Sequence, residues 1–227
     1  MAALIDGPRL GPTTNAKQLV VFLHGYGSDG KDLIALGKQW QALLPDAAFV
    51  SPNAPEPCAQ SPMGRQWFPL TMRDPAERWI GVNKAAPVLD AFLDAELAKH
   101  GLDDSKLALV GFSQGTMMAL HVGLRRRRAP AGIVGFSGVL VGPEHLSPAD
   151  GNAVPPVLLV HGSEDDVIPA DALFMSAEGL ADAAVPSQWH LSVGIGHGID
   201  APGMGHAALF LSTCFGLKIA APVPAGR

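Results

Sequence analysis

The stretch Leu107-Ala-Leu-Val-Gly-Phe-Ser-Gln-Gly-Thr-Met-Met-Ala-Leu120 joins a short apolar run to a longer apolar segment rich in methionine. Ser113 stands at the junction, with Gly111 two residues before it and Gly115 two residues after it. On a strained strand-to-helix turn a serine holds its hydroxyl out of the sheet, and its neighbours two residues away must be small so that strand and helix can pass closely. The pattern therefore predicts that Ser113 is a nucleophile at the end of a strand.

Two candidate partners of this serine follow later in the chain. The apolar run 157–160 ends in His-Gly-Ser-Glu-Asp-Asp, so either Asp165 or Asp166 follows the carboxyl end of a strand. The run 189–193 then leads into a glycine-rich loop that carries His197. In a catalytic triad a carboxylate orients the histidine that takes the proton of the serine. The order serine, aspartate, histidine is typical of the α/β-hydrolase fold.

A fourth stretch lies near the beginning of the sequence, where the apolar run 19–23 is followed by His24-Gly-Tyr-Gly-Ser-Asp-Gly30. Acyl transfer needs two backbone N–H groups directed at the developing oxyanion, one from the residue after the nucleophile and one from an early strand-to-helix loop. We expect the N–H groups of Gln114 and Tyr26 to form this oxyanion hole.

Other residues offer weaker alternatives for the same roles. His24 and His161 each end a strand before a glycine, where histidines more often bind loop backbone than carry out chemistry. His206 also follows the aspartates and is the main alternative to His197, but flanking glycines place it in the first turn of a helix. Ser137 lies in a similar Gly-Phe-Ser-Gly stretch, but a valine stands where the second glycine is needed. We therefore favour His197 as the base.

Short apolar runs alternate with longer amphipathic segments along the chain. We expect strands at 19–23, 48–51, 107–110, 133–136, 157–160 and 189–193, and helices at 31–44, 76–100, 114–127, 170–184 and 204–217. This alternation predicts an α/β fold with a mostly parallel twisted sheet and helices on both faces. We expect one domain over residues 1–227 without a large cap, with an N-terminal segment at 1–16 and a flexible tail at 221–227.

Residues 53–75 interrupt the alternation with a proline-rich segment that carries Trp67, Phe68 and Leu70. A long connection in a compact domain is usually functional or disordered. It is a rigid surface loop whose aromatic side chains pack on the core, a flap over an acyl pocket, or both at once. In the second case Trp67, Phe68 and Leu70, together with Ile168, would bind substrate.

Composition excludes several classes of protein. A net charge of −5 and a pI near 5.8 argue against nucleic-acid binding. We expect no membrane span and no secretory signal, because no apolar run of about 18 residues occurs and the first residues lack a basic stretch before an apolar one. With only two cysteines we expect reduced thiols in the cytoplasm. We read the arginines of 125–128 as a solvated helix end matched to the helix dipole.

Taken together, the motifs resemble the bacterial carboxylesterases of the phospholipase/carboxylesterase family, which are relatives of the acyl-protein thioesterases. The matching segments cover nearly the whole chain and lie at 22–30, 51–55, 66–68, 111–115, 161–169 and 196–198. In that family the carboxylate is the fifth residue counted from the His-Gly pair, which implies Asp165 rather than Asp166. Thr116 departs from the glycine or alanine that relatives often carry, but removes no catalytic group.

The resemblance implies a serine carboxylesterase that hydrolyses short- to medium-chain carboxylic esters through an acyl-enzyme on Ser113. It implies the triad of Ser113, Asp165 and His197, and neither a metal nor an organic cofactor. We expect a small-molecule ester as ligand, with no nucleic acid and no stable membrane insertion, and leave a homodimer open. The alternatives are an acyl-protein thioesterase or lysophospholipase and, in another class, a catalytically idle hydrolase-fold binding protein.

Overall fold

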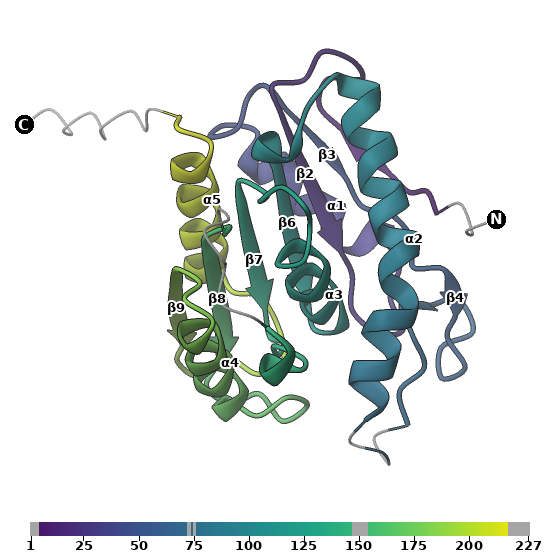
Figure 1. Ribbon diagram of the computed structural model, residues 1–227, viewed down its shortest axis with the longest axis vertical. Coiled ribbons are helices and arrows are strands. Elements are labelled where there is room, and N and C mark those ends of the chain that lie inside the picture. The colour runs from purple at the N-terminus through teal and green to yellow at the C-terminus, as the bar shows by residue number, and fades with distance from the viewer. Residues whose placement is uncertain (1–4, 72–73, 75, 147–153, 218–227) are drawn as a thin grey trace, which may run out of the picture.

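The computed structural model describes residues 5–71, 74, 76–146 and 154–217. They contain a seven-stranded sheet in the order β1-β3-β2-β6-β7-β8-β9 (Figure 1). All neighbouring strands pair in parallel except β1 and β3. The strands are β1 (Arg9–Leu10), β2 (Gln18–Leu23), β3 (Ala47–Val50), β6 (Leu107–Phe112), β7 (Gly132–Phe136), β8 (Val157–Gly162) and β9 (Ser187–Ser192). The mostly parallel sheet is confirmed, whereas the tail expected at 221–227 lies outside the described residues.

Helices cover both faces of the sheet (Figure 1). One face carries α2 (Glu77–His100), α3 (Gln114–Gly123) and α4 (Asp171–Asp182), and the other carries α1 (Gly30–Trp40) and α5 (Ala201–Cys214). Successive strand residues point to opposite faces, so Val21 packs with α2 and α3 while Val20 and Phe22 pack with α1. Both sets are buried, which is why the strands are continuous apolar runs in the sequence.

Several boundaries differ from those expected. The helix α5 begins three residues early at Ala201, because the Asp200 side chain accepts a hydrogen bond from Gly203 N–H (2.9 Å) and Pro202 fits the first turn. Inside the proline-rich segment the chain forms a short hairpin of β4 (Glu56–Pro57) and β5 (Arg65–Gln66). Two single 3₁₀ turns, η1 (Asp104–Lys106) and η2 (Pro143–His145), were also not expected.

The arginines of 125–128 form the expected solvated end only in part, because Arg125, Arg127 and Arg128 are exposed whereas Arg126 is not. The helix α3 ends at Gly123, and the Arg126 guanidinium is nearly buried between three carboxylates, with Asp90 at 2.8 Å, Asp94 at 2.6 Å and Asp104 in close contact. Arg126 thus joins the end of α3 to α2 and η1 through an ion-pair cluster. In the described part of the chain, the helices are all too short or too polar to cross a membrane.

Candidate active site

Ser113 occupies a strained turn between β6 and α3, with φ 53° and ψ −115°. Residues with a Cβ rarely adopt positive φ, and such strain is concentrated at functional sites. The flanking glycines are required by close packing. A Cβ on Gly115 would lie 1.8 Å from the carbonyl oxygen of Leu23, and one on Gly111 would lie 2.4 Å from the Gly115 carbonyl carbon. Strand and helix can therefore pass only if both positions are glycine.

Two backbone N–H groups are available beside this serine. Gln114 is the first residue of α3, where an N–H has no partner within the helix. Tyr26 lies in the loop after β2, which is the parallel neighbour of β6. Neither N–H group has an acceptor among the described residues. Both residues line one cavity with Ser113.

The Gln114 side chain ties the proline-rich segment to the turn. Its Oε1 accepts from the N–H of Trp67 (2.9 Å), and its Nε2 donates to the carbonyl oxygen of Phe68 (2.8 Å). All three residues are buried, so these bonds fix the segment against the elbow. The motif around Ser113 does not predict this contact, because Trp67 and Phe68 lie 47 and 46 residues before Gln114 in the sequence.

Asp165 and His197 are brought together although they lie in loops after different strands. Asp165 Oδ2 accepts from His197 Nδ1 at 2.8 Å, and Oδ1 accepts from the N–H groups of Val167 (2.9 Å) and Ile168 (2.8 Å). Burial raises the pKa of Asp165, but the hydrogen bonds from Ile168, His197 and Val167 outweigh it and hold the pKa below its ordinary value. The neighbouring Asp166 is exposed.

A second histidine touches the same carboxylate. The buried His161 donates its Nε2–H to the carbonyl oxygen of Ile168 (2.8 Å), and this nitrogen lies 3.2 Å from Asp165 Oδ2. We expected His161 to bind loop backbone, which it does. The carboxylate contact was missed, because it depends on the turn 165–168 folding back onto the end of β8.

His24 has a structural position, as expected. Its Nδ1–H donates to the carbonyl oxygen of Gly25 (2.8 Å), and its Nε2 accepts from Ala54 N–H (3.0 Å). Burial lowers the pKa of His24 and favours the neutral ring that this pattern needs. The ring therefore fixes the loop that carries Tyr26.

The loop of His197 lies next to the elbow. The rings of His197 and Phe112, the residue before Ser113, have centroids 5.0 Å apart. The Ser137 hydroxyl donates to the carbonyl oxygen of Gly198 (3.1 Å) and anchors the same loop to the end of β7. The hydrogen bonds of the described residues do not include one from Ser113 Oγ to His197. Such contacts are often long in free enzymes and tighten when substrate binds.

A cleft of about 230 Å³ opens at Ser113. Its lining comprises Tyr26, Gln60, Leu70, Thr71, Arg78, Ser113, Gln114, Met117, Val167 and Ile168. Leu70 and Ile168 thus lie where we expected them. Trp67 and Phe68 do not line the cleft, because both are buried in the core, and Trp67 Nε1–H donates to the carbonyl oxygen of His24 (3.0 Å). Their backbone groups instead bind the side chain of Gln114, which does line the cleft.

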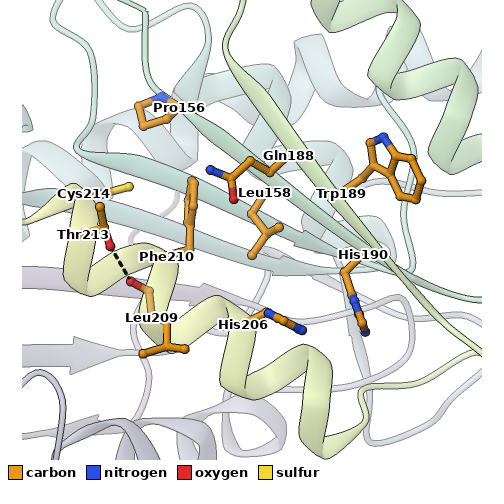
Figure 2. A pocket seen from close by; sticks show the side chains of 10 residues that line it. All are labelled: Pro156, Leu158, Gln188, Trp189, His190, His206, Leu209, Phe210, Thr213 and Cys214. Carbon is orange, nitrogen blue, oxygen red and sulfur yellow. Dashed lines mark hydrogen bonds between the residues drawn. The ribbon is translucent and has the colours of Figure 1, made fainter. Parts of the chain in front are cut away.

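A larger cavity of about 550 Å³ lies elsewhere, between β9 and α5 (Figure 2). His206, the alternative base, points into it, and its ring centroid is 4.4 Å from that of His190. The thiol of Cys214 also lines it, but burial raises the pKa of this thiol to about 11 and keeps it protonated at neutral pH. Ser113, Asp165 and His197 do not border this cavity, so its larger size does not make it the catalytic site.

Comparison with known proteins identifies the family of this chain. The family model of phospholipases and carboxylesterases matches residues 10–215. Esterase YpfH of Escherichia coli (strain K12) is 29% identical over 190 residues, covering 83% of this chain and 79% of that protein. Acyl-protein thioesterase 1 of Gibberella zeae is 27% identical over 196 residues, covering 78% and 82%.

Solved structures show the same architecture. The crystal structure of esterase PE8 superposes with a TM-score of 0.87 at 45% identity and covers 93% of this chain and 99% of that one. A phospholipase/carboxylesterase from Dyadobacter fermentans gives a TM-score of 0.72 at 25% identity, with coverage of 93% and 98%. The α/β-hydrolase fold is thereby confirmed. The chain belongs to the phospholipase/carboxylesterase family and is a serine hydrolase of the carboxylesterase type.

Proposed function

We propose that this protein hydrolyses short- to medium-chain carboxylic esters through an acyl-enzyme on Ser113. The observation that carries the proposal is the strained Ser113, which follows the carboxyl end of β6, on the side of the sheet where the buried Asp165 orients His197. His197 Nδ1 lies 2.8 Å from Asp165 Oδ2. A nucleophile, a base and a buried acid in this order are the parts that acyl transfer requires.

Each residue has a defined part in the proposed reaction. Ser113 Oγ attacks the ester carbonyl while His197 Nε2 takes its proton, and Asp165 holds the Nδ1–H tautomer and stabilises the imidazolium. The N–H groups of Tyr26 and Gln114 bind the oxyanion, each contributing about 3 kcal/mol to the transition state. His197 then gives its proton to the leaving alcohol. A water activated by the same histidine hydrolyses the acyl-enzyme.

The acyl preference can be tested with nitrophenyl esters from acetate to palmitate. Each methylene that fits the 230 Å³ cleft should add about 0.8 kcal/mol of binding in the transition state. We expect kcat/KM to rise with acyl length, reach a maximum below the long fatty acyl groups, and then fall. Leu70→Ala, which enlarges the lined space, should move the maximum to longer chains.

A profile that still rises at palmitate would contradict this preference. It would favour the thioesterase or lysophospholipase alternative, which the similarity to acyl-protein thioesterases keeps open. A palmitoyl thioester assayed beside the esters distinguishes these outcomes. Absence of turnover for every ester and thioester would favour a hydrolase-fold binding protein.

His161 is expected to act by positioning Asp165. His161→Phe removes the donor that holds the Ile168 carbonyl and touches the carboxylate, so kcat should fall roughly ten- to hundredfold with little change in KM. His161→Gln keeps an N–H donor and should recover part of the loss. A matched reduction in both variants, or a change confined to KM, would contradict a positioning role.

We further infer that the protein is cytoplasmic and forms a single domain, and we keep the homodimer as a proposal. The two cysteines, Cys58 and Cys214, are both free, which supports a reducing compartment. One continuous sheet runs through the described residues, which supports one domain. Size-exclusion chromatography with light scattering would test the dimer.

A further inference from the structure

The loop that carries Tyr26 is paired with the β4–β5 hairpin of the proline-rich segment. Gly27 N–H donates to the carbonyl oxygen of Arg65 (2.9 Å), and Arg65 N–H donates to the carbonyl oxygen of Ser28 (2.7 Å). Loop and hairpin thereby form an antiparallel bridge. They also pack closely, since a Cβ on Gly64 would lie 2.1 Å from the carbonyl oxygen of Gly27. The two residues that follow Tyr26 are therefore placed by Arg65.

The side chain of Arg65 is itself fixed by a second segment. Its Nε donates to the carbonyl oxygen of Ala54 (2.8 Å), and its Nη2 donates to that of Pro55 (2.6 Å). Ala54 N–H in turn donates to Nε2 of His24 (3.0 Å), two residues before Tyr26. Hydrogen bonds from a charged donor are stronger than those between neutral groups. The half-buried guanidinium thus connects the two ends of the Tyr26 loop through the segment after β3.

The side chain of Tyr26 touches the same hairpin. Its hydroxyl donates to the thiol of Cys58, and this hydrogen bond, together with burial, raises the pKa of Tyr26 to about 12. Cys58 is buried in the hairpin, where its N–H donates to the carbonyl oxygen of Gly64 (2.9 Å). A displaced hairpin would therefore move Tyr26 through its side chain as well as through its backbone.

The Tyr26 loop needs such support, because Gly25 and Gly27 flank the tyrosine and glycine stiffens a backbone least. A catalytic group that is misplaced by about 1 Å can lose roughly a hundredfold in rate. An oxyanion-hole N–H acts chiefly when charge develops on the carbonyl oxygen, so its position affects the transition state more than the bound substrate.

We propose that Arg65 is a positioning residue, which holds the N–H of Tyr26 in the oxyanion hole by joining the β4–β5 hairpin to the segment after β3. The inference rests on the proposed function, because it gives Arg65 a part in the same acyl transfer. The described residues that line the cleft do not include Arg65. Its effect on the reaction therefore passes through the Tyr26 loop.

Arg65→Met tests this role, because methionine keeps the apolar stem and removes every donor of the guanidinium. We expect kcat for nitrophenyl acetate to fall about ten- to hundredfold. Arg65→Lys keeps the charge and one of the two carbonyl contacts, so it should recover part of the loss. Circular dichroism melts report whether each variant is folded.

A transition-state analogue gives a readout that a merely structural role would not move. Ser113 Oγ adds to the carbonyl carbon of 1,1,1-trifluoro-2-hexanone, the C=O π bond opens, and the serine proton passes to His197. The resulting oxyanion occupies the oxyanion hole. Its inhibition constant should rise in each Arg65 variant by the factor by which kcat/KM falls.

The matched ligand is 2-hexanone, whose unactivated carbonyl does not form this adduct and which reports on ground-state binding. Its inhibition constant should stay within about twofold in both variants. Loss of folded protein alone would lower the measured kcat and leave both inhibition constants unchanged. That pattern would overturn the positioning role. If Arg65→Met does not fold, the same relation in Arg65→Lys decides.

Arg125→Met is the matched control. Arg125 also donates from its guanidinium to a backbone carbonyl, that of His121 (3.2 Å), but it lies just beyond the end of α3 and is not among the described residues that line the cleft. It should keep kcat and both inhibition constants. An equal loss in Arg125→Met, or unchanged kinetics in Arg65→Met, would overturn the inference.

Ser113→Ala separates this inference from the proposed function. Turnover of nitrophenyl acetate that Ser113→Ala abolishes, together with unchanged kinetics in Arg65→Met, would overturn the role of Arg65 and leave the esterase proposal standing. No turnover of any nitrophenyl ester by the unmodified protein would overturn both.

Discussion

Ser113→Ala is expected to lower kcat/KM for nitrophenyl acetate by about ten-thousandfold to a millionfold. The substitution removes the attacking oxygen and leaves the oxyanion N–H groups in place, so a small residual activity should persist. Alanine also has a Cβ, and the positive φ of 53° is no more strained for it than for serine. The melting temperature should therefore change little. Steady-state kinetics and a circular dichroism melt check both parts.

Ser137→Ala is the matched control for this substitution. Ser137 also has a positive φ, 44°, and its hydroxyl lies near the His197 loop, where it donates to the carbonyl oxygen of Gly198. Losing this one hydrogen bond should cost about 1 kcal/mol of stability, and most of the activity should remain. Near-normal turnover by Ser113→Ala, or an equal loss in both variants, would show that Ser113 is not the nucleophile.

The sheet was predictable because both of its faces are covered. Burial on two sides makes the inner strands β2, β3, β6, β7 and β8 largely apolar, and these apolar runs placed each of the five within about two residues. The edge strand β9 is partly exposed and less apolar, and its observed range also lies within two residues of the expected one. Helix ends were less predictable, since they depend on caps and on tertiary contacts. The end of α3 is an example, because the helix ends at Gly123 and the Arg126 side chain, just beyond it, pairs with carboxylates of α2 and η1.

The candidate site was partly predictable for a related reason. Carboxyl ends of parallel strands meet at one edge of a sheet, so residues that follow β6, β8 and β9 could be expected near one another. The sequence order then distinguished Asp165 and His197 from other acids and histidines. Their catalytic roles stay predictions.

The substrate cleft was not predictable in this way. The aromatic side chains of Trp67 and Phe68 suggested a pocket wall, but Gln114 draws their backbone against the elbow and buries both rings. The position of Arg78 in the cleft could not be predicted from its neighbours in the sequence, because an arginine in the first turn of a helix is usually an ordinary surface residue. Only the packing of α2 beside the elbow brings it to the cleft.

Asp165→Asn is expected to lower kcat about ten-thousandfold with the fold retained. The N–H groups of Val167 and Ile168 require an oxygen at the position of Oδ1, so the new amide nitrogen must replace Oδ2. That nitrogen then faces His197 Nδ1 and donates to it. The imidazole must carry its proton on Nε2, and this tautomer cannot accept the proton of Ser113. The same nitrogen also opposes the Nε2–H of His161, which adds a repulsion between two donors.

Asp166→Asn provides the control, since its side chain is exposed and one residue away. It should keep nearly full activity. Stability against pH gives a second readout. Because the pKa of Asp165 is lowered in the folded state, its ionised form stabilises the protein above the ordinary pKa of 3.8, and this stabilisation is lost as the pH falls through the folded pKa. Asp165→Asn should therefore weaken the acid dependence of the melting temperature, while Asp166→Asn should leave it unchanged. Greater damage from Asp166→Asn in either measurement would show that the carboxylate beside His197 is not the functional acid.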